Sequence, residues 1–276
     1  MNQIADASLT EYDAHMEAVR TLPFVGGEVA IFSRRSPDKT TSNEDALAVL
    51  TTNQTMGVLA VADGCGGESN GLEAAQRAIS ALAQSVSAAN SPDSLRAAIL
   101  DGFELAGRRV AELGGRAATT LIAVEFGNHL IRTYHVGDSQ ALLVGGRGKV
   151  KLQTRAHSPV GYAMEAGMLT EDAALEHEDR HIVSNVIGSP ESHIDMGLPR
   201  PLSKRDTLII GSDGLYDNLT QAEIVDLIRK GSLGAAAEAT RQKVAERMRG
   251  DDATAPCKPD DFTMLIFRPC SSTDPV

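Results

Sequence analysis

The sequence predicts a layered α+β domain, in which mostly antiparallel sheets pack together as a β-sandwich and helix pairs flank them. Short strand-like runs dominate the chain, and several of them follow one another directly. The helical stretches come as one early pair and one late pair. Paired helices between blocks of strands favour packed sheets over alternating strand–helix–strand units.

The strands are predicted from short apolar runs, most of which are bounded by Gly, Asn, Asp or Pro. They cover residues 28–33, 45–50, 56–63, 119–126, 129–137, 140–145, 150–154, 206–214 and 261–267. Gly127 and Asn128 lie between two of these runs, and a glycine-rich segment separates a later pair. We therefore expect a meander of antiparallel hairpins over residues 118–154.

The helices are predicted from apolar residues at helical spacing and from residues typical of helix ends. They cover residues 70–89, 91–113, 220–231 and 234–250. Ser91 followed by Pro92 is a helix-start pattern, and Thr220 with Glu223 forms a capping-box pattern. Residues 9–19 fit either a packed helix or a loose arm, and we prefer the helix.

Length and composition predict one soluble domain. The chain has 276 residues, of which 42% are hydrophobic, and we place the domain at 26–268, with an N-terminal extension at 1–25 and a tail at 269–276. A formal net charge of −11 argues against nucleic-acid binding. The chain has no apolar stretch of membrane length, so no membrane partner is expected. Its three cysteines show no CxxC spacing, and we expect a cytoplasmic protein.

Acidic residues at the ends of predicted strands are the main indication of function. The run VLAVA is followed directly by Asp63, which begins the glycine-rich stretch DGCGG. The same arrangement recurs at other strand ends, where the acids are Glu44, Asp45, Asp138, Asp213, Asp260 and Asp261. Strand ends can converge at a sheet edge, and converged carboxylates repel one another unless a multivalent cation lies between them.

The donor atoms predict the kind of cation. All of the candidate ligands are oxygens, which favours Mg²⁺ or Mn²⁺ over zinc or copper. Any single aspartate beside a glycine is also typical of a turn. The stretch DGCGG fits either a tight turn or a close approach of the backbone to an ion, and the residues alone leave both interpretations open.

The motifs NEDA, DGCGG, GDSQA, SDGLYDN and DDFT follow one another within residues 26–268. Their order resembles that of the metal-dependent protein phosphatase (PPM/PP2C) family, in particular its bacterial members. The resemblance implies a β-sandwich flanked by helix pairs, with a two-metal centre that hydrolyses phosphoserine and phosphothreonine in proteins. Water held between two Mn²⁺ or Mg²⁺ ions would attack phosphorus, and the enzyme would oppose a serine/threonine kinase.

The resemblance also implies individual metal ligands. Asp63 would bridge two metals, the Gly64 carbonyl would bind the first, and Asp213 and Asp260 would complete the second. Asp260 is preferred to Asp261 because the first acid of the family's last motif is the ligand.

Three further acids have secondary roles in this resemblance. Glu44 and Asp45 would act on the metals mainly through water. Asp138 of GDSQ would help to hold a third, weaker metal, so two or three ions per chain are expected.

The chain departs from the family pattern in three places. The family's phosphate-binding arginine is missing from its usual position, and Lys39 lies near that position. We prefer Arg35, with Arg34 beside it, as the phosphate-binding residue, because a guanidinium binds phosphate at two points. Cys65 replaces the residue that is often His or Met in the family, which leaves protonation of the leaving group to water. Residues 156–190 resemble the family's flap, whose sequence governs substrate choice.

Two other functions fit parts of the sequence. A non-catalytic signalling module of the same fold would bind phosphoprotein without turnover, but the full set of acids argues against it. Residues His177 to His181 match the HExxH pattern of zinc proteases. Charged residues at both of the variable positions, and a location at the end of the flap, argue against a zinc site.

Overall fold

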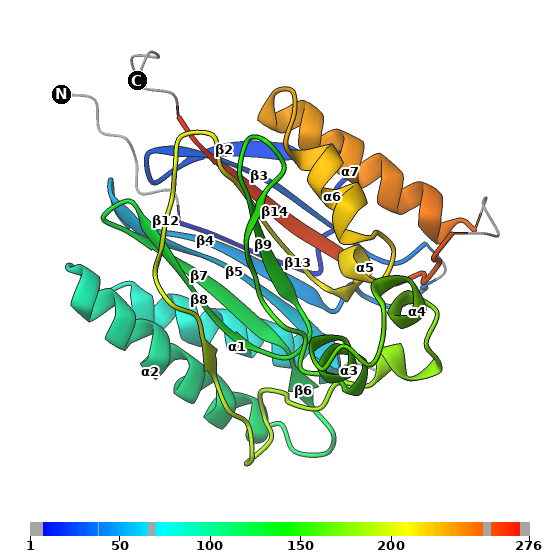
Figure 1. Ribbon diagram of the computed structural model, residues 1–276. Coiled ribbons are helices and arrows are strands. Elements are labelled where there is room, and N and C mark those ends of the chain that lie inside the picture. The colour runs from blue at the N-terminus through cyan, green and yellow to red at the C-terminus, as the bar shows by residue number, and fades with distance from the viewer. Residues whose placement is uncertain (1–7, 38, 66–69, 251–254, 271–276) are drawn as a thin grey trace.

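The computed structural model describes residues 8–37, 39–65, 70–250 and 255–270, and it shows two antiparallel sheets packed face to face (Figure 1). The first sheet contains, in spatial order, β1 (Leu9–Tyr12), β4 (Asp45–Asn53), β5 (Met56–Cys65), β7 (Leu121–Gly127), β8 (Leu130–Val136) and β11 (Asp195–Met196), with β6 (Ala118–Thr119) on β5 and β12 (Arg200–Pro201) on β8. The second contains β10 (Val150–Gln153), β9 (Gln140–Val144), β13 (Thr207–Gly211), β14 (Phe262–Pro269), β3 (Gly27–Arg34) and β2 (Arg20–Phe24).

Helices cover both outer faces of the sandwich. These are α1 (Asn70–Val86) and α2 (Pro92–Ala111) on the first sheet, and α6 (Gln221–Ile228) and α7 (Leu233–Met248) on the second (Figure 1). The shorter α3 (Pro159–Glu165), α4 (Glu171–Leu175), η1 (Glu178–His181) and α5 (Asp213–Tyr216) lie near one end. The predicted layered α+β fold is therefore confirmed. Within the described ranges, no helix is long and apolar enough to cross a membrane.

The central strand β5 shows why its sequence is a continuous apolar run. Ala60 and Ala62 point toward α1 and α2, whereas Leu59 and Val61 point into the space between the sheets, and all four are fully buried. A strand with two buried faces needs no polar alternation. The small residues on the outer face let α1 pack closely through residues such as Ala78.

The N-terminal segment differs from the prediction. The helix expected over 9–19 is wrong, because Leu9–Tyr12 form β1 on the edge of β4. Leu9 contacts the core between the sheets and Tyr12 contacts the core beneath α1 and α2. Residues three apart face opposite sides in a strand but the same side in a helix. Because β2 also pairs with β3, residues 9–24 supply an edge strand to each sheet.

The predicted meander is divided between the sheets. Its hairpins β7–β8 and β9–β10 form, the first around Asn128 and His129, whose φ angles are +53° and +60°. Between β8 and β9, however, the chain crosses from the first sheet to the second. Gly137 makes this crossing with φ +108°, where a Cβ would lie 2.6 Å from Thr120. The crossing places Asp138 at the end of both sheets.

Replacing Phe126 by alanine is expected to destabilise the sandwich. Its ring is 98% buried and packs edge-on against Phe24 and Phe267, with ring centroids 5.0 and 4.7 Å away. Loss of a buried aromatic ring costs about 3–5 kcal/mol of unfolding free energy, which urea denaturation measures. The control Leu198→Ala, at a side chain 72% exposed, should change it by less than about 0.5 kcal/mol. Equal effects of the two substitutions would contradict this packing.

Candidate metal centre

Carboxylates from both sheets meet at one end of the sandwich. Asp45 begins β4 and lies directly opposite Asp63, near the end of β5. Asp213 follows β13, and Asp260 precedes β14, the strand paired with it. In an antiparallel pair, the end of one strand lies beside the start of the other. Ser212 links the sheets here, because its hydroxyl donates a 2.8 Å hydrogen bond to Oδ2 of Asp45.

These carboxyl groups are close enough to disturb one another's ionisation. Burial, followed by the charges of Asp213 and Asp45, raises the pKa of Asp63 well above its usual value. The pKa of Asp45 is raised likewise by burial and then by Asp261. Burial and the Asp213 charge raise the pKa of Asp260 to about 7. The protein thus assembles acids that oppose each other's ionisation at neutral pH.

Asp138 also belongs to this acidic cluster, and so does Asp217, which is not among the predicted ligands. Burial, then Asp213 and Asp217, raise the pKa of Asp138 to about 8. Burial and then Asp213 raise the pKa of Asp217 to about 6. The signal for Asp217 was its spacing, because it comes four residues after Asp213 in SDGLYDN, on the same side of one helical turn.

Two buried carboxylate oxygens without hydrogen-bond partners indicate the kind of ion that this acidic cluster could bind. Oδ1 of Asp45 and Oδ1 of Asp138 are buried without a hydrogen-bond partner within the described part of the chain. A buried oxygen without a partner is costly, and a hard divalent cation would satisfy several such oxygens together. The donor set therefore fits Mg²⁺ or Mn²⁺.

The backbone at Gly64 approaches the start of α1 closely. A Cβ on Gly64 would lie 2.1 Å from the Gly71 carbonyl oxygen, and a Cβ on Gly71 would lie 2.4 Å from Oε1 of Glu44. The Gly64 amide also donates to the Glu44 carbonyl oxygen at 3.2 Å. Gly64 therefore lies within β5, against the backbone of Gly71, and the approach of DGCGG to an ion stays a prediction; its last two glycines lie outside the described residues.

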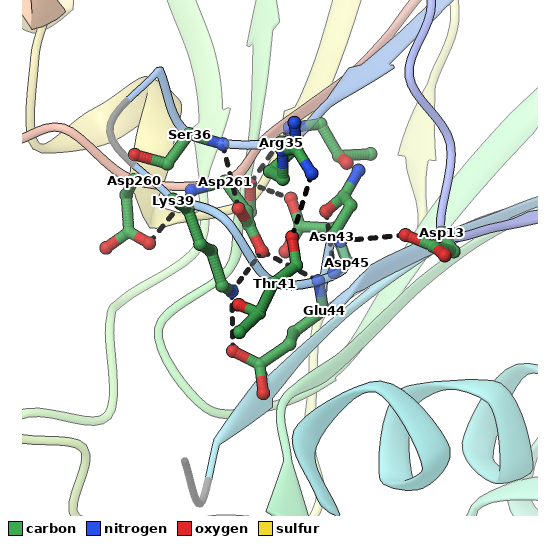
Figure 2. A network of polar contacts seen from close by, with 12 residues as sticks. Asp13, Arg35, Ser36, Lys39, Thr41, Asn43, Glu44, Asp45, Asp260 and Asp261 are labelled. Carbon is green, nitrogen blue, oxygen red and sulfur yellow. Dashed lines mark hydrogen bonds and ion pairs between the residues drawn. The ribbon is translucent and has the colours of Figure 1, made fainter. Parts of the chain in front are cut away.

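Asp260 and Asp261 have different surroundings (Figure 2). Asp261 accepts hydrogen bonds from the amides of Ser36 and Glu44, at 2.9 and 2.6 Å, and from Nζ of Lys39 at 2.7 Å. It thus holds this loop at Ser36, Lys39 and Glu44. Asp260 accepts a hydrogen bond at Oδ1 from the Asp261 amide. Burial and the Asp213 charge raise the pKa of its carboxyl group.

The candidate phosphate-binding arginines are engaged elsewhere. Arg34 pairs with Glu17 at 3.2 Å on the surface. Arg35 donates from Nη1 to the carbonyl oxygen of Thr41 at 3.2 Å and so holds its own loop (Figure 2). Lys39 pairs with Glu44 at 2.6 Å as well as with Asp261.

The HExxH residues form no zinc site. Nδ1 of His177 accepts from the Asp179 amide, and Nδ1 of His181 bonds the Glu178 carbonyl oxygen, so both rings face their own turn. Over the described ranges, the possible metal ligands whose atoms all lie within 4.8 Å of one another are instead His135, His157 and Asp195; the oxygens of the acidic cluster are not that close together.

The hydrogen bonds of His157 argue against a metal there. Its Nδ1 accepts from the Gly137 amide at 3.1 Å and from the Asn185 side-chain amide at 2.9 Å. A neutral imidazole that accepts at Nδ1 carries its proton on Nε2, which then cannot coordinate. His157 also bonds Gly137 and Ser184 through its backbone, so it joins both ends of the 156–190 segment to the Gly137 crossing.

A cavity of about 360 Å³ lies between the acidic cluster and the 156–190 segment. Its lining includes Asp138, Asp213 and Asp217, together with residues of the segment such as Val160 and Glu171. The segment expected as a flap therefore borders the acids.

Comparison with known proteins identifies the family. The sequence profile described as protein phosphatase 2C matches residues 35–249. The chain belongs to the protein phosphatase 2C family. A putative protein phosphatase 2C-type protein of Streptococcus pyogenes is 28% identical over 69% of this chain and 80% of its own length.

Solved structures share the fold of this phosphatase 2C member. The S. agalactiae serine/threonine phosphatase superposes with a TM-score of 0.76 at 24% identity, over 88% of this chain and 99% of the other. A serine/threonine protein phosphatase of Mycobacterium tuberculosis, named PstP, is also a relative. The catalytic domain of a phosphatase with this name has been solved in complex with 2 manganese ions. It superposes with a TM-score of 0.67 at 23% identity, over 87% and 96% of the two chains.

Gly71→Ala is expected to displace Glu44 or the Gly64 carbonyl group and so to reduce both Mn²⁺ affinity and phosphatase activity by at least about tenfold. The added methyl group meets both atoms within 2.8 Å. Gly107→Ala in α2 is the matched control, because its Cβ would meet nothing within 4 Å. Calorimetric Mn²⁺ titration of both variants checks the result, and unchanged affinity in Gly71→Ala would contradict the tight approach.

In chelator, the protein is expected to lose stability as the pH rises from about 5 to about 8. The folded-state pKa values of Asp260 and Asp138, about 7 and about 8, lie above the ordinary value of 3.8. Between these values the folded state binds more protons than the unfolded state, so the free energy of unfolding falls with pH. Urea denaturation at about pH 6 and about pH 8 measures the slope. Greater stability at the higher pH would refute the proposed crowding of charge.

Proposed function

We propose that Asp63, Asp213, Asp260 and the Gly64 carbonyl group hold two Mn²⁺ or Mg²⁺ ions and that the protein uses them to hydrolyse phosphoserine and phosphothreonine in proteins. By its family, the chain is a metal-dependent serine/threonine protein phosphatase. The observation that supports this ligand set is the meeting of acids from both sheets, with raised pKa values, at one end of the sandwich.

Other acids complete the proposed centre. Glu44 and Asp45 act on the ions through water, and Asp138 contributes to a third, weaker position. Ser212 holds Oδ2 of Asp45, which leaves the buried Oδ1 for a water molecule. The solved PstP domain with 2 manganese ions supports Mn²⁺ as a suitable ion.

The chain's own residues position the reaction. Divalent ions supply an activated water and neutralise charge on the phosphoryl oxygens. Asp63 is fixed on both sides, because its amide donates to Thr120 Oγ1 and its carbonyl oxygen accepts from Thr119 Oγ1, each at 2.9 Å. This fixed backbone would keep the Asp63 carboxyl group in place to hold an ion. Arg35 remains our proposed phosphate contact, with Arg34 as the neighbouring alternative.

Cys65 is not expected to act as a nucleophile. Burial, followed by the charge of Asp138, raises the pKa of its thiol far above neutrality. A protonated thiol is a poor nucleophile. Water near the ions is therefore left to protonate the leaving alkoxide.

The proposed substrate is a phosphoprotein, and the proposed counterpart is a serine/threonine kinase. Such a kinase uses ATP, which supports the proposal that the pair acts in the cytoplasm. The three free thiols, Cys65, Cys257 and Cys270, support a reducing location.

Asp63→Asn is expected to reduce hydrolysis of p-nitrophenyl phosphate and of phosphothreonine peptides by about 100-fold or more, since it removes a proposed bridging ligand. Wild-type activity should require added Mn²⁺ or Mg²⁺ and disappear in chelator. Asp101→Asn, at an exposed position of α2, should retain full activity. Phosphopeptide binding by the wild type without metal-dependent turnover would instead favour a non-catalytic module of the same fold.

A further inference from the structure

Lys258 places its ammonium group inside the acidic cluster. Nζ pairs with Asp213, with Oδ2 of Asp217 at 2.7 Å and with Oδ2 of Asp260 at 3.4 Å. The side chain is only 16% exposed. One protein cation therefore contacts two of the proposed ligands and one acid, Asp217, that has no assigned role.

The backbone of Lys258 is held where this contact requires it. Its amide donates to Oδ1 of Asn218 at 2.9 Å, and its carbonyl oxygen accepts from Nδ2 of the same residue at 2.8 Å. Asn218 is fully buried beside α5, which carries Asp213. This paired bond joins the loop before β14 to the end of α5 and directs the lysine toward the acids.

An ammonium group and a divalent ion compete for the same oxygens. Mg²⁺ binds oxygen at about 2.0–2.1 Å and prefers an unobstructed octahedral shell. Lys258 cannot keep its contacts with both Asp213 and Asp260 while an ion occupies the position between them, because like charges at such separations repel strongly. Asp217 offers the lysine an alternative partner without moving the backbone.

We propose that Lys258 is a built-in cation of the metal centre, which neutralises Asp213 and Asp260 until the second divalent ion binds and then withdraws to Asp217. The inference rests on the proposed function, because it takes Asp213 and Asp260 as ligands of that ion. Its consequence is that the second ion binds more weakly than the acid count alone predicts. The lysine thus sets the metal concentration at which the centre fills.

Calorimetric titration of the full chain with Mn²⁺ tests this role. Lys258→Met removes the charge and keeps a long apolar stem, so the weaker Mn²⁺ step should tighten by about tenfold or more. Asp217→Asn removes the alternative partner, so the same step should weaken. Lys151→Met is the control, because Lys151 pairs with Asp206 at 2.7 Å, at the opposite end of β13 from Asp213, and should change nothing.

A double variant separates this role from direct metal binding by Asp217. If Asp217 acts only through the lysine, Asp217→Asn in the Lys258→Met background should leave Mn²⁺ affinity unchanged. A second readout is stability: in chelator, Lys258→Met should melt below wild type, and excess Mn²⁺ should raise its melting temperature by more than it raises that of wild type. Weaker or unchanged Mn²⁺ binding in Lys258→Met would overturn the proposal.

The two hypotheses fail in different ways. If wild type binds Mn²⁺ and Asp63→Asn does not, while Lys258→Met behaves as wild type, the proposed function stands and the role of Lys258 falls. If wild type gives no Mn²⁺ binding, or if Asp63→Asn binds as wild type does, the proposed ligand set falls, and the inference about Lys258 falls with it.

Discussion

Repulsion among buried carboxylates is the constraint on which this structure depends. Asp45, Asp63 and Asp213 lie at the ends of strands from two different sheets, and burial with mutual charge raises the pKa values of the first two. A fold that brings such groups together must offset their repulsion with protons, ammonium groups or metal ions. Lys258 and Lys39 offset part of it from within the chain, and the proposed divalent ions would offset the remainder. The same constraint explains why the site requires a rigid sandwich beneath it.

The architecture could be predicted because local and global signals agree. Apolar runs such as the one ending at Asp63 correspond to strands with two buried faces, and the caps at Ser91 and Thr220 form as their sequences indicate. The N-terminal segment could not be predicted in this way. The residues of β1 have weak local preference, and only their contacts with β4 and the two cores decide between strand and helix.

The convergence of the acids could be anticipated from the strand ends, but their individual environments could not. Asp260 and Asp261 are adjacent in sequence and precede β14, yet the charge of Asp213 acts on one, whereas the other accepts hydrogen bonds from the loop of Lys39. Whether an arginine faces solvent or its own loop depends on distant partners such as Glu17 or on a carbonyl group. Lys258 carried no motif at all, because its contacts arise from tertiary structure.

The 156–190 segment is anchored to the rest of the fold through His157. Both ends of this loop are tied to one residue and to the Gly137 crossing, through backbone bonds and through the ring. Between those ties the chain lines the cavity with residues such as Val160 and Glu171, whereas Asp138, Asp213 and Asp217 come from outside the segment. Such a closed loop can accept insertions or exchanges while the scaffold beneath it stays fixed. Exchanges within the loop would therefore alter one side of the cavity and leave the positions of Asp138, Asp213 and Asp217 unchanged.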